Sequence, residues 1–97
     1  MKQRGYNDKY PETIEAWRLN EKIPEWLSDR AKITFIDGSG NVTLDKTDDP
    51  DGGYAIKDAS GTRELVRTKS KDDYVCFGNN KVFSLSRKQL EILYESN

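Results

Sequence analysis

The stretch from Asp73 to Glu95, which reads D-Y-V-C-F-G-N-N-K-V-F-S-L-S-R-K-Q-L-E-I-L-Y-E, decides the fold of this chain. Two runs rich in β-branched and aromatic residues, Tyr74–Phe77 and Lys81–Leu85, flank a short turn. The turn sequence Gly78-Asn79-Asn80 tolerates positive φ angles. The stretch therefore begins with a predicted β-hairpin.

A C-terminal helix is predicted directly after this hairpin. Ser86 is followed three residues later by Gln89, which is the spacing of a capping box. Leu90, Leu93 and Tyr94 fall at positions i, i+3 and i+4, so they form one apolar stripe. We expect this stripe to pack on the sheet.

The upstream sequence adds strands and one short helix. Ile23–Ala31 reads as a helix because Pro24 suits the first helical position and Glu25 suits the positive end of the helix dipole. Strands are predicted at Glu12–Leu19, Ile33–Ile36, Val42–Leu44, Tyr54–Ile56 and Glu64–Lys69, the second and third of these forming a hairpin around a Gly-rich loop.

These elements predict a single α+β domain over residues 10–97. We expect a twisted, mainly antiparallel sheet of about five or six strands, with a short helix after the first strand and a second helix at the C-terminus. Residues 1–9 are polar, and we expect them to form a flexible N-terminal arm. The acidic segment 45–53 is expected to be an exposed loop.

Composition limits the classes of function. The chain has 97 residues, a net charge of −1 and a mean hydropathy of −0.92, which predict one domain with a thin core. The balanced charge gives no general attraction to nucleic acid or to anionic membranes. One cysteine and a polar N-terminus without an apolar signal segment favour the cytoplasm. A homo-oligomer that shares core surface would suit so small a domain.

The catalytic inventory is poor. The chain has no histidine, which removes the commonest general base and the commonest metal ligand. Cys76 lies inside a predicted strand, so we expect a buried hydrophobe rather than a reactive thiol. The segment from Thr47 to Asp58 partly resembles a calcium loop, but Pro50 and the missing flanking helices oppose an EF-hand. We expect no metal, no cofactor and no enzymatic activity.

A basic stripe is the leading candidate for a contact surface. Arg63, Arg67, Lys69 and Lys71 share parity in the predicted strand before Asp73, so they would project from one face. This face would bind a protein partner, with the acidic loop from Asp45 to Asp51 as a second contact surface.

Aromatic residues suggest further sites. Trp17 and Trp26 are expected in the core, whereas Tyr6 and Tyr10 in the N-terminal arm are candidates for exposed contacts. An alternative site is a small-ligand pocket for an anionic nucleotide, which would combine two cations with an aromatic ring. Its residues would be Arg67, Lys69, Tyr54 and Tyr74.

Two blocks resemble a family of small phage and prophage proteins of unknown function, the PGDYG proteins. Ile14–Leu19, with the short helix around Trp26, is similar to the family's V-E-A-x-Q-W opening. Asp73–Gly78 resembles its G-D-Y-I-x-x-G motif, and Val82–Leu85 and Leu90–Glu95 resemble its E-F-Y-P strand and closing F-x-x-x-Y-E helix. The resemblance implies a phage origin and cytoplasmic expression in a bacterial host, and it supplies no active site.

The function expected from these observations is a non-enzymatic binding protein made by a phage or prophage. It would act by occupying a host or phage protein, with host-defence components among the candidates. The alternatives are a protein that binds or sequesters an anionic nucleotide and a minor structural protein of the virion.

Overall fold

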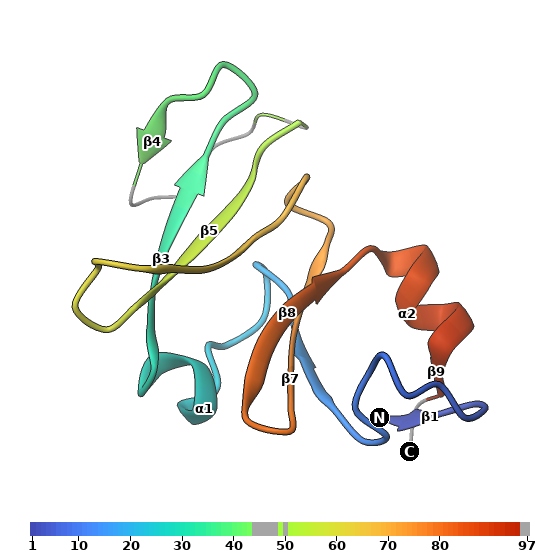
Figure 1. The fold of residues 1–97 in the computed structure, drawn as a ribbon. Coiled ribbons are helices and arrows are strands. Elements are labelled where there is room, and N and C mark those ends of the chain that lie inside the picture. The colour runs from blue at the N-terminus through green and yellow to red at the C-terminus, as the bar shows by residue number, and fades with distance from the viewer. Residues whose placement is uncertain (44–48, 50, 96–97) are drawn as a thin grey trace.

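The computed structural model describes residues 1–43, 49 and 51–95 of the chain (Figure 1). The strands are β1 (Lys2–Gln3), β2 (Glu15–Trp17), β3 (Ala31–Ile36), β4 (Val42–Thr43), β5 (Gly53–Asp58), β6 (Glu64–Arg67), β7 (Tyr74–Gly78), β8 (Lys81–Leu85) and β9 (Tyr94–Glu95), and the helices are α1 (Glu25–Ser28) and α2 (Arg87–Leu93). Mostly antiparallel sheets with two helices confirm the predicted α+β domain.

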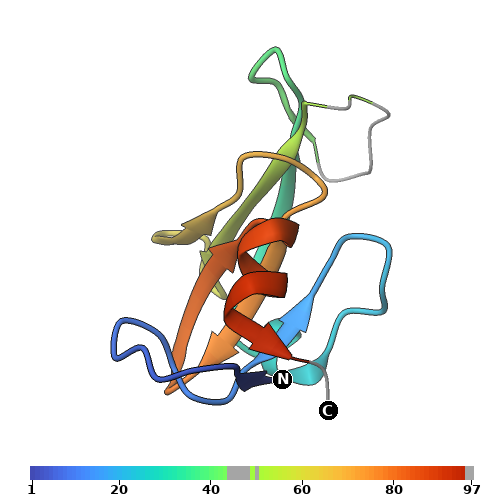
Figure 2. The ribbon, with the colours of Figure 1, turned by 90° about the vertical axis from the view of Figure 1, so that its right-hand side faces the viewer.

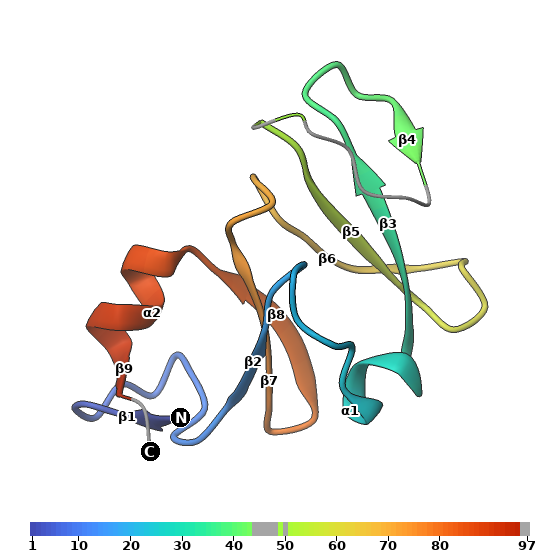
Figure 3. The same ribbon diagram turned by 180° about the vertical axis from the view of Figure 1, so that it is seen from behind.

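The strands form separate sheets, so the single sheet of five or six strands was a wrong prediction. Within the described residues, one sheet has the order β2-β7-β8, another has the order β4-β3-β5-β6, and β1 pairs with β9. All pairings are antiparallel. The division arises because the chain leaves β6 at Arg67 and enters β7 only after the connection 68–73, instead of continuing in one sheet (Figures 1 and 3).

The β2-β7-β8 sheet is buried on both faces. Along β7, Val75 belongs to a cluster with Trp17 and Tyr54, while its neighbour Cys76 belongs to a second cluster with Leu90 of α2. Successive side chains of a strand point to opposite faces, so one strand serves both clusters. The predicted stripe of the C-terminal helix therefore covers the face of this sheet that is turned away from β3 and β5.

The segment that we expected to decide the fold forms as predicted. The hairpin pairs Gly78 with Lys81, and the two turn residues Asn79 and Asn80 have φ angles of 49° and 63°. Positive φ at both central positions is typical of a two-residue hairpin turn whose twist matches the strands. At the start of α2, the Ser86 side chain accepts from the Gln89 N–H, and the Gln89 side chain reaches back, which confirms the capping box.

The first helix is shorter than predicted. It covers Glu25–Ser28, whereas the sequence suggested Ile23–Ala31. Pro24 occupies the N-cap with an extended conformation and provides no side-chain cap. Ala31 instead begins β3, where it pairs with Asp58 in the ladder with β5. The β-branched run that follows Ala31 favours this sheet pairing over another helical turn.

The N-terminal segment makes contacts that the predicted flexible arm would lack. Lys2–Gln3 pair with Tyr94–Glu95, and the N-terminal amino group donates to the Ile14 carbonyl at 2.8 Å. The Gln3 side chain also donates to the Asn7 carbonyl at 2.9 Å. The β1–β9 pairing holds the N-terminus against the C-terminal end of the chain (Figure 2).

Tyr54 of β5 joins the two larger sheets. Its side chain is fully buried and packs against the rings of Trp17 and Phe35. Its hydroxyl accepts from the Leu19 N–H at 2.8 Å and donates to the Lys71 carbonyl at 2.6 Å. Leu19 follows β2 and Lys71 precedes β7, so one hydroxyl in the β5 sheet bridges two segments attached to the other sheet.

Replacing Tyr54 with Phe should destabilise the protein by about 1–3 kcal/mol, because the ring stays while two backbone groups lose their buried partner. Urea denaturation measures this change as a lower midpoint with an unchanged slope. Tyr6→Phe is the control, since the Tyr6 side chain is 92% exposed. Equal stability of Tyr54→Phe and wild type would contradict the bridging role.

Candidate functional site

The predicted basic stripe does not share one face. In the β5–β6 ladder, Ile56 pairs with Val66 but Lys57 pairs with Glu64, so Leu65 is an extra residue. Such a bulge reverses the alternation of side chains. Arg67 consequently lies on the same face as Glu64, and their side chains form a two-point ion pair at 2.7 and 3.2 Å. Arg63, on the other side of the bulge, is separated from Arg67.

Lys69 and Lys71 lie in the connection 68–73 and not in a strand. The Lys69 N–H donates to the Asp73 carboxylate at 2.9 Å, and the Lys71 carbonyl accepts the Tyr54 hydroxyl. These backbone contacts fix the turn. Lys69 and Lys71 therefore do not follow the side-chain alternation of a strand, on which the predicted common face was based. The four predicted cations thus do not form one stripe: Arg67 and Lys69 line the same hollow, whereas Arg63 lines a different one.

The alternative ligand pocket also forms only in part. Arg67, Lys69 and Tyr54 line a hollow of about 230 Å³, which Asp37 and Asp51 line as well. Tyr54 offers no exposed ring surface, and burial raises the pKa of its hydroxyl to about 12. Tyr74 packs on the opposite face of the β2-β7-β8 sheet, in the cluster that includes α2. The predicted pairing of Tyr74 with the other three residues was therefore wrong.

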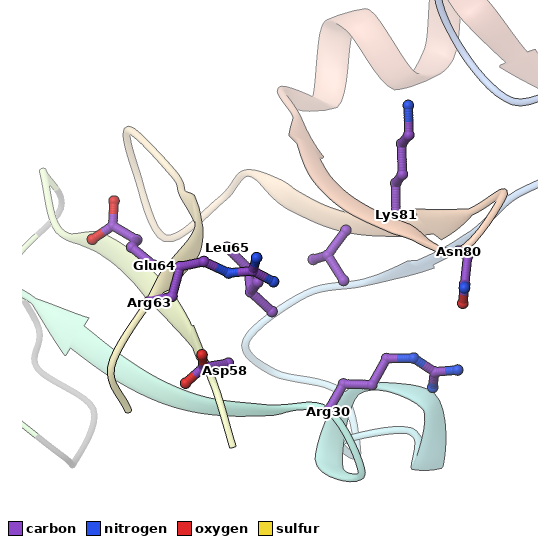
Figure 4. A pocket seen from close by; sticks show the side chains of 8 residues that line it. Arg30, Asp58, Arg63, Glu64, Leu65, Asn80 and Lys81 are labelled. Carbon is purple, nitrogen blue, oxygen red and sulfur yellow. The ribbon is translucent and has the colours of Figure 1, made fainter. Parts of the chain in front are cut away.

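A larger hollow lies elsewhere, and we call it the basic groove. Its volume is about 620 Å³. The side chains that surround it come from the turn between α1 and β3, from the hairpin that joins β5 to β6, and from the β7–β8 turn with the start of β8 (Figure 4). Its lining residues are Arg30, Asp58, Arg63, Glu64, Leu65, Asn80, Lys81 and Val82.

The basic groove lies between two sheet edges. In the described sheets, β6 pairs only with β5, and β8 pairs only with β7. Leu65, the bulge residue of β6, and Val82 of β8 supply its apolar part. Figure 4 shows the Arg63 side chain extending from the residue before β6 toward β8, while the Arg30 side chain runs beneath Asn80 and the Lys81 side chain points away from both. The groove is therefore open to solvent and rimmed by cations.

The acidic residues of the groove are engaged locally. Glu64 is paired with Arg67, and its side chain points away from the groove in Figure 4. Asp58 accepts the Ser60 hydroxyl at 2.8 Å and the Thr62 N–H at 3.0 Å. These hydrogen bonds, that of Ser60 above all, lower the pKa of the Asp58 carboxyl. Among the described residues, neither Arg63 nor Lys81 has an ion-pair partner, so the groove keeps uncompensated positive charge.

Arg30 differs from the other two cations because its position is fixed. Its Nη1 donates to the Trp26 carbonyl at 3.0 Å, and its guanidinium lies 4.6 Å from the centre of the Phe77 ring. The Phe77 ring is in turn stacked on Trp26, with a centroid distance of 5.3 Å and an interplanar angle of 12°. Arg30 and Lys81 were not among the site residues predicted from the sequence. The spacing of Trp26 and Arg30, four residues apart at a predicted helix end, was the available signal.

The predictions for single residues have mixed outcomes. Cys76 is buried, and Trp17 lies in the core, both as predicted. Trp26 is half-buried at the edge of the core. Tyr6 is exposed as predicted, whereas Tyr10 is half-buried and packs on Phe83.

The described residues were also compared with what a metal site and a membrane-spanning helix require. The described residues contain no group of three His, Cys, Asp or Glu side chains that could hold a metal ion. Most of the acidic loop, including Thr47, Asp48 and Pro50 of the calcium-like segment, lies outside the described residues. No helix in the described part of the chain has the length and apolar character needed to cross a bilayer.

Comparison with protein-family models, with curated proteins and with solved structures gives no match. The resemblance to the PGDYG proteins therefore stays a prediction from the sequence.

Alkaline pH should destabilise the fold through Cys76. Burial raises the pKa of this thiol from 9.0 to about 12, so the folded protein favours the protonated form. The corresponding stability is complete below pH 9 and is lost as the pH rises from 9 toward about 12, at up to about 1.4 kcal/mol per pH unit. Urea titrations between these pH values should show a smaller loss for Cys76→Ala than for wild type. An equal loss in both proteins would contradict this assignment.

Proposed function

We propose that this chain is a non-enzymatic binding protein whose basic groove captures an acidic segment of a partner protein. The observation that carries the proposal is that Arg30, Arg63 and Lys81, from three separate parts of the chain, line one groove together with the apolar residues Leu65 and Val82. Glu64 is paired with Arg67 and Asp58 is hydrogen-bonded within the Ser60–Thr62 turn, so three cations outnumber the one carboxylate of the groove that has no ion pair among the described residues.

The shape of the groove favours a protein segment. It lies between the edges of two sheets and is open to solvent, which suits a chain that passes through it. Apolar side chains of such a segment would contact Leu65 and Val82 while its carboxylates meet the cations at the rim. Each exposed ion pair is worth only about 0.2–1 kcal/mol, so affinity requires several contacts and should fall with added salt.

The identity of the partner is the part of the proposal that rests on the sequence resemblance alone. A phage or prophage protein without catalytic groups would act by occupying a host or phage protein. Components of host defence are the partner class that this origin favours. Cytoplasmic action in a bacterial host belongs to the same proposal.

A second candidate is the binding of an anionic nucleotide in the same groove. A volume of about 620 Å³ falls in the range of small-ligand sites, and the outer face of the Arg30 guanidinium could stack on a base. Calorimetry with cyclic and linear nucleotides tests this candidate. Saturable heats that are lost in Arg63→Ala would favour it over the protein partner, and a flat response would remove it.

Binding of an acidic peptide tests the leading proposal. The probe is a fluorescein-labelled peptide of alternating Glu and Leu, about ten residues long, which is enough to span a groove between strands. Fluorescence anisotropy at low salt should give saturable binding, and the double variant Arg63→Ala/Lys81→Ala should bind about five- to tenfold more weakly.

Two controls make this result specific. Lys2→Ala removes one positive charge from β1, which contributes no residue to the groove, and it should leave affinity unchanged. A peptide of alternating Lys and Leu should not bind. The proposal fails if the double variant and Lys2→Ala bind the acidic peptide equally well, or if wild type does not bind it.

A further inference from the structure

We infer that Arg30 is the residue that selects a carboxylate of the bound segment, while Arg63 and Lys81 provide attraction without selectivity. This inference rests on the proposed function and concerns the same groove. It assigns different roles to cations that sequence and net charge treat as equivalent.

The position of the Arg30 guanidinium is determined on two sides. The Trp26 carbonyl accepts one of its N–H groups at 3.0 Å, and the Phe77 ring lies against the guanidinium at 4.6 Å. Phe77 is itself held in place, because its ring is stacked on Trp26. Arg30 therefore presents its remaining donors from a fixed plane in the lining of the groove, beneath Asn80 of the β7–β8 turn (Figure 4).

A fixed guanidinium binds a carboxylate in a way that an ammonium cannot. Its planar arrangement of N–H donors matches the two oxygens of a carboxylate and forms two parallel hydrogen bonds. Less conformational entropy is lost on binding when the side chain is held in advance. A lysine at this position would keep the charge but lose both the paired geometry and the stacking on Phe77.

Arg63 and Lys81 lack such a fixed position. Among the described residues, neither side chain has a hydrogen-bond or ion-pair partner, and both are exposed. Mobile rim charges act mainly through the general electrostatic field, which depends on charge and salt rather than on the shape of the head group. Exchanging one type of cation for the other at these sites should therefore matter little.

Conservative exchanges at matched positions test the assignment. With the alternating Glu-Leu peptide, Arg30→Lys should bind about tenfold more weakly than wild type and nearly as weakly as Arg30→Ala. Lys81→Arg, the reverse exchange at the rim, should stay within about twofold of wild type. Phe77→Leu keeps Arg30 but removes the aromatic ring beneath it, and it should bind about threefold more weakly. Thermal melts of each variant confirm that it is folded.

The outcomes separate this inference from the proposed function. Wild-type affinity in Arg30→Lys, together with a loss in Arg63→Ala/Lys81→Ala, would overturn the role of Arg30 and leave the acidic-segment proposal in place. Wild-type affinity in both variants would overturn both. A loss in Lys81→Arg as large as that in Arg30→Lys would also overturn the inference, because position would then not distinguish the cations.

Discussion

The hydroxyl group of Tyr54 is the constraint on which the arrangement of the two larger sheets depends. It lies inside the apolar core, where an unpaired hydroxyl would cost about 1–3 kcal/mol. It is satisfied by one backbone donor at Leu19 and one backbone acceptor at Lys71. The backbone of Tyr54 adds a hydrogen bond from its N–H to the Thr68 hydroxyl, so the connection 68–73 is attached to β5 at two points. This connection leads directly into β7. The hydrogen bonds of Tyr54 in the β5 sheet therefore fix where the β2-β7-β8 sheet begins.

This arrangement explains why the groove lies where it does. Two sheets that share a core but not a ladder leave the edges of β6 and β8 facing each other. Open edges invite unwanted pairing, and proteins protect them with bulges and charged residues. Here the bulge at Leu65 interrupts β6 and Lys81 stands at the start of β8. The bulge and the edge charge also shape the charged, irregular groove, so the surface that protects the edges is the one proposed to bind the partner.

Local sequence signals predicted the parts of the fold that depend on neighbouring residues. The Asn79-Asn80 turn and the Ser86–Gln89 capping box both formed as expected, because their geometry is encoded within a few positions. The division into separate sheets was not predictable in this way, since it depends on Tyr54 meeting Leu19 and Lys71 across the fold. For the candidate site, Arg63 lines the basic groove, but the three cations predicted to accompany it do not. Leu65 is one extra residue in β6 and reverses the side-chain alternation. The strand sequence contains no pattern that predicts this bulge.

The role proposed for Arg30 follows from where α1 ends. Arg30 stands just beyond a helix of one turn, where the chain reverses into β3, so its side chain lies over Phe77 of the neighbouring sheet. Had the helix continued to Ala31 as its sequence suggested, Arg30 would be one more solvated helical residue. The early end of α1 thus converts a surface arginine into a fixed one. In a small domain with a thin core, such chain reversals are the places where a polar side chain can be held rigidly without being buried, and they are where selective contacts can be built.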